Sequence, residues 1–219
     1  MTPERTPEMF DQWADTYDDI IDTWSENFPF KGYFQILDRI FAIANPYPSM
    51  RILDLGIGTG NLAKKFTDIG CDTWGIDYSK RMLQLAKEKV PEAKLLQTDI
   101  RYEWPQELEL PFDRIVSAYV LHHFKLEEKV RISNRIMKDL LAPEGKFIVG
   151  DISFRSQKEL YDNRAKYSQE WDDTEYYWSA DLFIESMAKE GYSVEYEQIS
   201  YCGGIYIISS DSINSHFPT

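Results

Sequence analysis

Apolar residues in the central part of this chain fall into short runs that alternate with longer amphipathic segments. The short runs end near a glycine or an aspartate, and in the segments after them apolar residues recur at helical spacing. Short unbroken runs are typical of strands buried on both faces, and the recurring spacing is typical of a helix with one buried side. We expect strands over residues 52–55, 71–76, 94–97, 112–120 and 146–150, and helices between Gly60 and Gly70, from Ser79 to Val90 and from Leu126 to Leu141.

Strand and helix alternate in this way through at least four units. The alternation predicts a parallel sheet with right-handed crossover connections, in a single α/β domain. Gly70 is positioned to close the first helix, Ser79 to cap the second, and Pro143–Gly145 to turn the chain before the fifth strand.

The N-terminal part of the chain departs from this alternation. Four apolar residues share one face of a helix over residues 7–17, namely Phe10, Trp13, Ala14 and Tyr17. A polar, aromatic segment follows, and helical spacing resumes over residues 31–44 until the prolines of Asn45–Ser49 end it. We expect an N-terminal helical segment, residues 1–48, placed before the core.

The C-terminal part also follows a different pattern. A polar stretch rich in Tyr and Trp, residues 161–178, leads to a helix over 179–189. Two strands over 192–199 and 204–209, joined by a Gly-Gly turn, predict an antiparallel hairpin. We therefore place a core at residues 49–151 and a segment with the aromatic insert and the last strands at residues 152–219.

The composition narrows the class of partner. The 219 residues carry a formal net charge of -13 and a sequence pI near 4.7. Nucleic-acid affinity rests largely on clustered Lys and Arg, so a small molecule is the better candidate. Cys71 and Cys202 fit neither a disulfide framework nor a metal-ligand spacing, and no apolar run has the length of a signal peptide core or a membrane span. We expect a soluble, cytoplasmic protein with reduced cysteines.

Candidate chemistry begins at the turn after the first strand. Gly56, Gly58 and Gly60 alternate with other residues between that strand and the next helix. Such a turn leaves room for a ligand against bare backbone, with the N–H groups of a helix N-terminus facing it. The turn predicts a nucleotide-type binding site.

Carboxylates recur where the predicted strands end. Asp54, Asp77, Asp99 and Asp151 follow the first, second, third and fifth strands, and ligands of open parallel sheets bind outside those ends. Each of these aspartates could instead cap a helix or begin a turn, and this structural role is the favoured interpretation for Asp151. Asp77 lies 21 residues after Gly56, where an acidic side chain reaches a ribose in dinucleotide-binding folds.

Two features favour S-adenosylmethionine over NAD as the ligand. The glycine spacing is G-x-G-x-G rather than G-x-G-x-x-G, and Asp54 lies two residues before Gly56. A pyrophosphate is repelled by a carboxylate there, whereas an amino group and a sulfonium are attracted. An NAD-dependent oxidoreductase is therefore the weaker hypothesis.

Four motifs in order resemble those of class I S-adenosylmethionine-dependent methyltransferases. They are Asp54-Leu-Gly-Ile-Gly-Thr-Gly60, Gly75-Ile-Asp-Tyr-Ser79 with Met82, Gln97-Thr-Asp99, and Ser117-Ala-Tyr-Val-Leu-His-His-Phe124. The flanks, Phe10 to Asp18 and the Trp- and Tyr-rich insert, are similar to the small YrrT-like bacterial methyltransferases. The resemblance implies a Rossmann-like fold with a seven-stranded, mostly parallel sheet, a C-terminal antiparallel hairpin and an N-terminal helical lid.

The resemblance also implies roles for single residues. The glycine turn holds the methionine part of the cofactor, Asp77 binds both ribose hydroxyls, and Asp99 takes the adenine amino group with Ile100 beside the ring. Tyr78 and Met82 contact the adenosine, although Met82 equally suits the core of its helix. Ser117 lies at the end of the fourth strand against the cofactor. Tyr17 and Trp13 either cover the cofactor pocket or only pack the lid helix on the sheet.

A methyl group on a sulfonium is already activated, so few catalytic side chains are required. His122 and His123 are the candidates for a general base, and a structural role or a place in the substrate wall is the alternative. We expect no metal, because neighbouring residues on a strand end point in opposite directions and no Cys or carboxylate has suitable spacing.

The sequence thus predicts an enzyme that transfers methyl groups from S-adenosylmethionine to a small molecule and releases S-adenosylhomocysteine. A sensor module that binds the cofactor without transfer, and a tRNA methyltransferase, are the alternatives. The aromatic insert is either a lid over the acceptor or core for the last strands. The methyl acceptor and the oligomeric state are left open.

Overall fold

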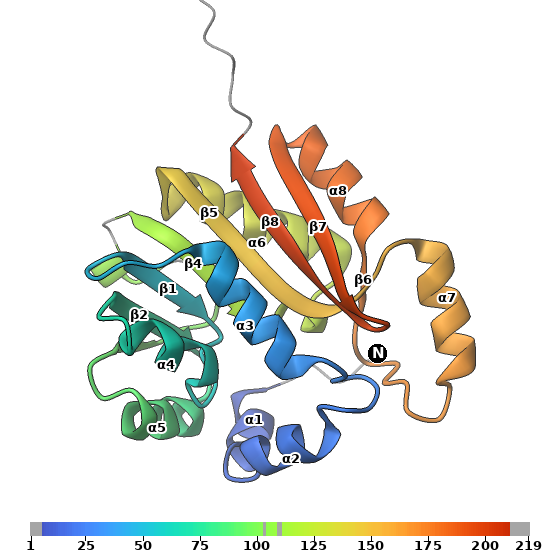
Figure 1. Ribbon diagram of the computed structural model, residues 1–219, viewed down its shortest axis with the longest axis horizontal. Coiled ribbons are helices and arrows are strands. Elements are labelled where there is room, and N and C mark those ends of the chain that lie inside the picture. The colour runs from blue at the N-terminus through green and yellow to red at the C-terminus, as the bar shows by residue number, and fades with distance from the viewer. Residues whose placement is uncertain (1–5, 103, 109–110, 211–219) are drawn as a thin grey trace, which may run out of the picture.

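An eight-stranded mixed sheet runs through the centre of the protein in the computed structural model, which describes residues 6–102, 104–108 and 111–210 (Figure 1). Seven strands lie in the order β3-β2-β1-β4-β5-β8-β7, and the two-residue strand β6 pairs with β5. The strands are β1 (Arg51–Leu55), β2 (Asp72–Asp77), β3 (Lys94–Gln97), β4 (Phe112–Ala118), β5 (Leu141–Phe154), β6 (Trp178–Ser179), β7 (Tyr192–Ser200) and β8 (Gly203–Ser210).

The pairing of the strands confirms the predicted sheet. The first five strands pair in parallel, whereas β8 pairs antiparallel with both β5 and β7. The order of the strands reverses between β1 and β4, and ligands of such sheets bind outside the carboxyl ends at this point.

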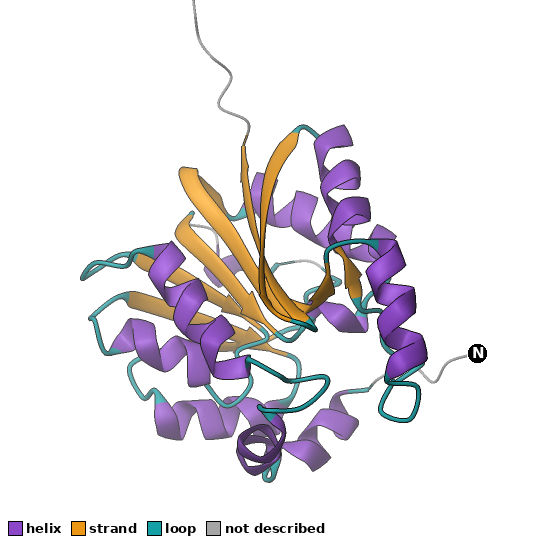
Figure 2. Ribbon diagram, turned by 45° about the vertical axis from the view of Figure 1, so that its right-hand side comes forward, coloured by secondary structure: helices purple, strands orange, loops and turns teal. Residues whose placement is uncertain are grey.

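Helices cover both faces of the sheet, as Figure 2 shows. They are α1 (Pro7–Ala14), α2 (Tyr17–Trp24), α3 (Tyr33–Ala44), α4 (Asn61–Thr67), α5 (Lys80–Lys89), α6 (Leu126–Asp139), α7 (Gln157–Lys166) and α8 (Ala180–Lys189), with short 3-10 helices η1 (Gln106–Leu108) and η2 (Leu121–His123). None of the helices within the described ranges combines the length and the apolar character that crossing a membrane requires.

Alternate residues of the inner strands pack into two separate hydrophobic clusters. Phe147 and Val149 of β5 pack with α6 and α8, whereas Ile148 between them packs with α3 and α4. All three side chains are fully buried. Burial on both faces explains why these strands read as unbroken apolar runs in the sequence.

The structure differs from the elements expected from the sequence in several places. The helix expected over residues 7–17 ends at Ala14, and a second helix, α2, occupies part of the polar, aromatic segment that follows. Helix α7 has no buried residue, so it lacks the apolar face by which a helix is recognised. The turn expected at Pro143–Gly145 is a bulge within β5, because Leu141 pairs with Phe112 and Lys146 already pairs with Arg114.

The N-terminal helices lie beside the carboxyl ends of the parallel strands. In Figure 1, α1 and α2 sit together below the sheet, close to α5. Helix α3 crosses the near face of the sheet, and α6 lies behind it. Residues 1–5 of the predicted N-terminal segment and residues 211–219 of the predicted C-terminal segment lie outside the described residues.

Candidate functional site

The turn between β1 and α4 uses its three glycines for different purposes. A Cβ on Gly58 would meet nothing within 4 Å, and this residue has a φ of +54°. A Cβ on Gly56 would lie 2.4 Å from Val120 Cγ2, and one on Gly60 would lie 3.3 Å from Val90 Cγ2. Gly58 therefore opens the turn toward a cavity, whereas Gly56 and Gly60 permit close packing.

A cavity of about 460 Å³ lies against this turn at the carboxyl ends of the strands. It is lined by nine of the residues singled out from the sequence, namely Tyr17, Gly56, Gly58, Asp77, Tyr78, Met82, Asp99, Ile100 and His123. A smaller hollow of about 20 Å³ shares Tyr17, Gly56 and Gly58 with it and reaches Asp54. The tertiary structure thus brings most of the predicted site into one place.

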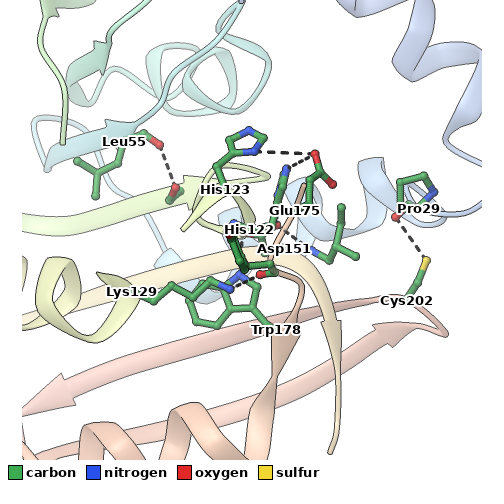
Figure 3. A network of polar contacts seen from close by, with 12 residues as sticks. Pro29, Leu55, His122, His123, Lys129, Asp151, Glu175, Trp178 and Cys202 are labelled. Atoms are coloured by element: carbon green, nitrogen blue, oxygen red, sulfur yellow. Dashed lines mark hydrogen bonds and ion pairs between the residues drawn. The ribbon is translucent and has the colours of Figure 1, made fainter. Parts of the chain in front are cut away.

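Besides Asp54, three predicted site residues do not line the larger cavity. Ser117 is fully buried, and its hydroxyl donates a hydrogen bond of 2.9 Å to the carbonyl of Leu55, which ties β4 to β1 (Figure 3). Gly60 packs against α5, and His122 lies behind His123 in a polar network described below. Their proposed contacts with cofactor or substrate stay predictions.

Asp77 holds the glycine turn in place at the end of β2. Its Oδ2 accepts a hydrogen bond of 3.0 Å from the backbone N–H of Gly58, and its Oδ1 accepts one of 2.9 Å from Ser79. Burial raises the pKa of Asp77 to about 6 against the opposing effect of these bonds. The carboxylate therefore both shapes the turn and borders the cavity.

Asp54 is a buried carboxyl group that lacks a full set of partners. Asp54 is 2 % exposed, and its Oδ2 atom has no hydrogen-bond partner among the residues that the structure describes. Burial, helped by the negative charge of Asp77, raises its pKa to about 8. A buried oxygen without a partner is costly, so this position is suited to a cationic or hydrogen-bond-donating ligand group.

Asp99 has a protein partner that the sequence analysis did not consider. The guanidinium of Arg101 forms a forked contact with it, with Nε–Oδ2 at 3.0 Å and Nη2–Oδ2 at 2.7 Å. Both side chains line the cavity. Asp99 therefore positions Arg101 at the cavity edge, and a ligand amino group would share the carboxylate with it.

Aspartates fasten the N-terminal helices over the cavity. Asp11 Oδ1 accepts a hydrogen bond of 2.5 Å from the Ser79 hydroxyl, and Asp18 Oδ2 lies 2.7 Å from Lys89 Nζ. Asp18 Oδ1 also accepts a bond of 2.7 Å from the Thr59 hydroxyl. These contacts join α1 and α2 to the helices α4 and α5, and they were missed because each pairs residues more than forty positions apart.

Phe10 lines the cavity from helix α1. Its ring lies 5.1 Å from that of Tyr78 and 5.2 Å from that of His123, between centroids. Trp13 contacts Phe10 at 5.6 Å, but its side chain is 43 % exposed. Phe10 of α1, rather than Trp13, is thus the aromatic side chain that covers the cavity next to Tyr17.

His122 and His123 lie on η2 with both rings directed toward Glu175 (Figure 3). Nε2 of His122 lies 3.5 Å from Oε1 of Glu175, and Nδ1 of His123 lies 3.9 Å from the same oxygen. The expectation that the two side chains point in opposite directions is wrong, because they belong to a 3-10 turn and not to a strand. Glu175 is 52 positions after His123, which is why spacing in the sequence gave no sign of it.

Asp151 holds His122 from the other side. Its Oδ1 is 2.6 Å from His122 Nδ1, and its Oδ2 accepts a bond of 2.9 Å from Trp178 Nε1. Burial lowers the pKa of His122, but the charges of Asp151 and Glu175 outweigh it and raise the pKa to about 9. Asp151 is thus neither a helix cap nor a cavity residue, and it anchors a buried network.

The aromatic insert divides between cavity and core. Tyr176 lines the cavity, and its backbone N–H donates a bond of 2.7 Å to the carbonyl of His122. Trp178 is buried against Phe183 and Tyr206, whereas Tyr161 is 56 % exposed. One part of the insert therefore lines the cavity, and another part belongs to the hydrophobic core beneath the last strands.

Comparison with known proteins places this chain among methyltransferases. Residues 52–145 match a family described as "Methyltransferase domain". An uncharacterized methyltransferase of Geobacillus kaustophilus is 31 % identical over 202 residues, which cover 87 % of this chain and 90 % of the relative. The uncharacterized methyltransferase YrrT of Halobacillus halophilus is 30 % identical over 210 residues, with 88 % and 92 % of the two chains covered.

Solved structures share the fold at lower identity. Magnesium protoporphyrin IX methyltransferase from Synechocystis, solved with bound S-adenosylhomocysteine, superposes with a TM-score of 0.70 at 16 % identity and covers 94 % of this chain and 100 % of its own. The DhpI complex with S-adenosylhomocysteine gives a TM-score of 0.71 at 15 % identity, with 93 % and 94 % covered. These likenesses extend well beyond the region of the family match, into the lid helices and the final hairpin.

Proposed function

This chain belongs to the class I S-adenosylmethionine-dependent methyltransferases, and we propose that the acceptor of its methyl group is a small molecule bound in the cavity beneath Phe10. The cofactor is S-adenosylmethionine, which leaves as S-adenosylhomocysteine. The relatives' names specify no acceptor.

Two features of the cavity fit this cofactor. The unpartnered Oδ2 of Asp54 would find a partner in a cationic amino group, and the open space at Gly58 leaves room for a ligand against the backbone. We propose that Asp54, Tyr17 and Gly56 hold the methionine part of the cofactor. On the adenosine side we propose Asp77 for the ribose, with Asp99, Ile100, Tyr78 and Met82 around the adenine.

When bound, S-adenosylmethionine supplies a methyl group that its sulfonium has already activated for transfer. The protein then has to align the acceptor and keep water away. Phe10 and Tyr17 cover the cavity from the N-terminal helices, and Tyr176 encloses it from the insert. Enclosure from these separate segments is the observation that supports a small acceptor, because a polymer needs an open surface.

His123 is the histidine that lines the cavity, and we assign it to the acceptor side of the wall. His122 does not line the cavity, and its ring is held between Asp151 and Glu175, so we assign it a positioning role. A role of either imidazole as general base stays a prediction.

Label from S-adenosylmethionine with a radioactive methyl group should appear in small molecules. The purified protein is incubated with a low-molecular-weight cell extract, with total RNA and with a protein fraction, and the release of S-adenosylhomocysteine is followed in each. We expect release with the low-molecular-weight extract alone, because separate segments of the chain cover much of the cavity. Transfer to RNA would instead support a tRNA methyltransferase, and cofactor binding without transfer to any fraction would support a sensor.

The affinity for S-adenosylmethionine should rise with pH between about pH 5.5 and about pH 7. Asp54 and Asp77 have raised pKa values of about 8 and about 6, and a cationic ligand favours their ionised forms. Binding therefore releases protons, so the association constant increases, by at most about tenfold per pH unit for each group. This window stays below the pKa of an α-amino group, about 7.7–8.0. Isothermal titration calorimetry in buffers of different ionisation enthalpy measures both the association constant and the number of protons released on binding.

Asp54→Asn is the matched control for this prediction, because an amide does not titrate. It should flatten most of the rise, and an equally steep rise in this variant would contradict the assignment of Asp54. In the absence of ligand, the stability of the folded protein should depend on pH in the opposite direction. The folded protein keeps a proton on Asp54 that the unfolded chain has released, so its stability should fall as pH rises from about 4 toward the pKa of about 8.

A further inference from the structure

We propose that His122, His123 and Glu175 form a binding site for a divalent transition metal of the Zn²⁺ or Co²⁺ type. Within the described residues, these three are the group of His, Cys, Asp and Glu whose ligand atoms all lie within 4.8 Å of one another. The site lies at the edge of the cavity and goes beyond the proposed methyl transfer, since it rests on the geometry of its own side chains.

The distances between the ligand atoms suit a small metal ion. Tetrahedral Zn²⁺ has N and O ligands at about 2.0–2.2 Å, which places the ligand atoms about 3.4 Å from one another. His122 Nε2 and Glu175 Oε1 are 3.5 Å apart, and His123 Nδ1 and the same oxygen are 3.9 Å apart. The two imidazole nitrogens lie within 4.8 Å of each other, so the His123 side chain has to move toward His122 and Glu175 to complete the set.

The surroundings prepare His122 for coordination. Oδ1 of Asp151 accepts from Ile152 N–H at 2.8 Å, and Oδ2 accepts from His122 N–H at 2.9 Å, so the carboxylate is fixed where it meets His122 Nδ1. A neutral imidazole that donates its Nδ1 proton to this carboxylate has a lone pair on Nε2, which faces Glu175. A carboxylate behind a metal-binding histidine is the usual outer-shell partner in zinc sites.

The segment that carries Glu175 is fastened to η2. The N–H of Tyr176 donates a bond of 2.7 Å to the carbonyl of His122, and Lys129 Nζ donates to the carbonyl of Tyr176. Trp178, two residues further along, donates to Asp151. The three ligand side chains therefore belong to a rigid region and are largely protected from solvent, with exposed side-chain fractions of 4 %, 16 % and 12 %.

The donor set indicates the class of metal. Two imidazole nitrogens and one carboxylate suit Zn²⁺, Co²⁺ or Ni²⁺ better than Mg²⁺ or Ca²⁺, which prefer oxygen ligands. Three protein ligands leave a position for water or another ligand, and sites of this composition are typical of catalytic rather than structural zinc. His123 lines the cavity, so that position is within reach of it.

The alternative to a metal site is that His122 is protonated and forms ion pairs with the carboxylates of Asp151 and Glu175. The two possibilities differ in a direct measurement, which is titration of metal-free protein with Co²⁺ followed by its visible d–d absorption. We expect one Co²⁺ per chain, displaced by Zn²⁺, and a rise in the melting temperature. Absence of stoichiometric Co²⁺ binding would overturn the metal site and establish the ion pair.

Single substitutions locate the site. Glu175→Gln preserves the shape of the side chain, and His123→Asn preserves a polar side chain, so both should fold. Each should weaken Co²⁺ binding by more than about tenfold, the lower end of what outer-shell substitutions cost. Asp173→Asn changes an exposed carboxylate of the same segment, and His216→Ala removes the third histidine of the sequence, so both should bind like the unchanged protein.

Unchanged Co²⁺ binding in both ligand variants would place the metal elsewhere and overturn the proposal. None of these measurements uses a methyl acceptor. A failure of the proposed function, seen as absence of transfer to small molecules, is therefore distinguishable from a failure of the metal site.

Discussion

Gly58→Val is expected to lower the affinity for S-adenosylmethionine by at least about 100-fold, or about 2.7 kcal/mol. The Cβ position of Gly58 has no atom within 4 Å and lies on the cavity wall, so a valine would extend its two methyl groups into the space assigned to the cofactor. The turn around it is held by the bond from Gly58 N–H to Asp77, which a side chain on Gly58 does not remove. Calorimetric titration with S-adenosylmethionine measures the loss.

Gly70→Val is the matched control. Gly70 also has a positive φ, +84°, and also has open space at its Cβ, but it lies between α4 and β2 and away from the cavity. Both variants therefore carry the strain of a left-handed backbone, roughly 1–2 kcal/mol, which a melting curve reports. Only Gly58→Val should lose the cofactor. Equal affinity in the two variants would show that the ligand does not lie against Gly58.

Asp151→Ala should lower the free energy of unfolding by about 3–5 kcal/mol, the scale for breaking a buried charged pair. The side chain is fully buried and accepts hydrogen bonds from His122, Trp178 and the backbone of Ile152. Without it, a buried imidazole and a buried indole N–H lose their acceptor, and the segment that carries Glu175 keeps its pairing with β5 through β6 but loses the bond from Trp178 to Asp151. Urea denaturation followed by tryptophan fluorescence measures the change.

Asp162→Ala serves as the reference for this measurement. Asp162 pairs with Lys158 on the exposed helix α7, and its side chain is 62 % exposed, so the cost should stay within about 0.5 kcal/mol. Asp151→Asn keeps the shape and one acceptor oxygen and should fall between the two. A loss below about 1 kcal/mol for Asp151→Ala would mean that this network does not stabilise the insert.

Local pattern was sufficient for most of the central fold. Strands β1, β3 and β4 begin within a residue of their predicted starts. In β1 and β4, burial of the strand produces a short run rich in apolar residues that can be recognised in the sequence. The pattern failed for α7, which has no fully buried residue and packs on the core mainly through Leu160, and at β5, where a bulge allows Pro143 to lie within a strand.

The N-terminal helices show a similar limit. The apolar pattern correctly predicts a helix over residues 7–14, but it does not show what the acidic side chains of the N-terminal helices contact. Asp11 and Asp18 meet Ser79, Thr59 and Lys89 only after the sheet has been assembled. Charged residues on a helix face are usually solvated, so no local signal separated these from ordinary surface residues.

The sequence by itself determined the glycine turn, since a strand, three glycines and a helix are consecutive and their spacing dictates the backbone. It also determined that Asp54, Asp77 and Asp99 converge, because parallel strands bring their carboxyl ends to one edge. Only the tertiary structure decided which side chains line the cavity and that one carboxylate oxygen of Glu175 lies near both His122 and His123. Those contacts join segments far apart in the chain, and their distances depend on packing that no spacing in the sequence encodes.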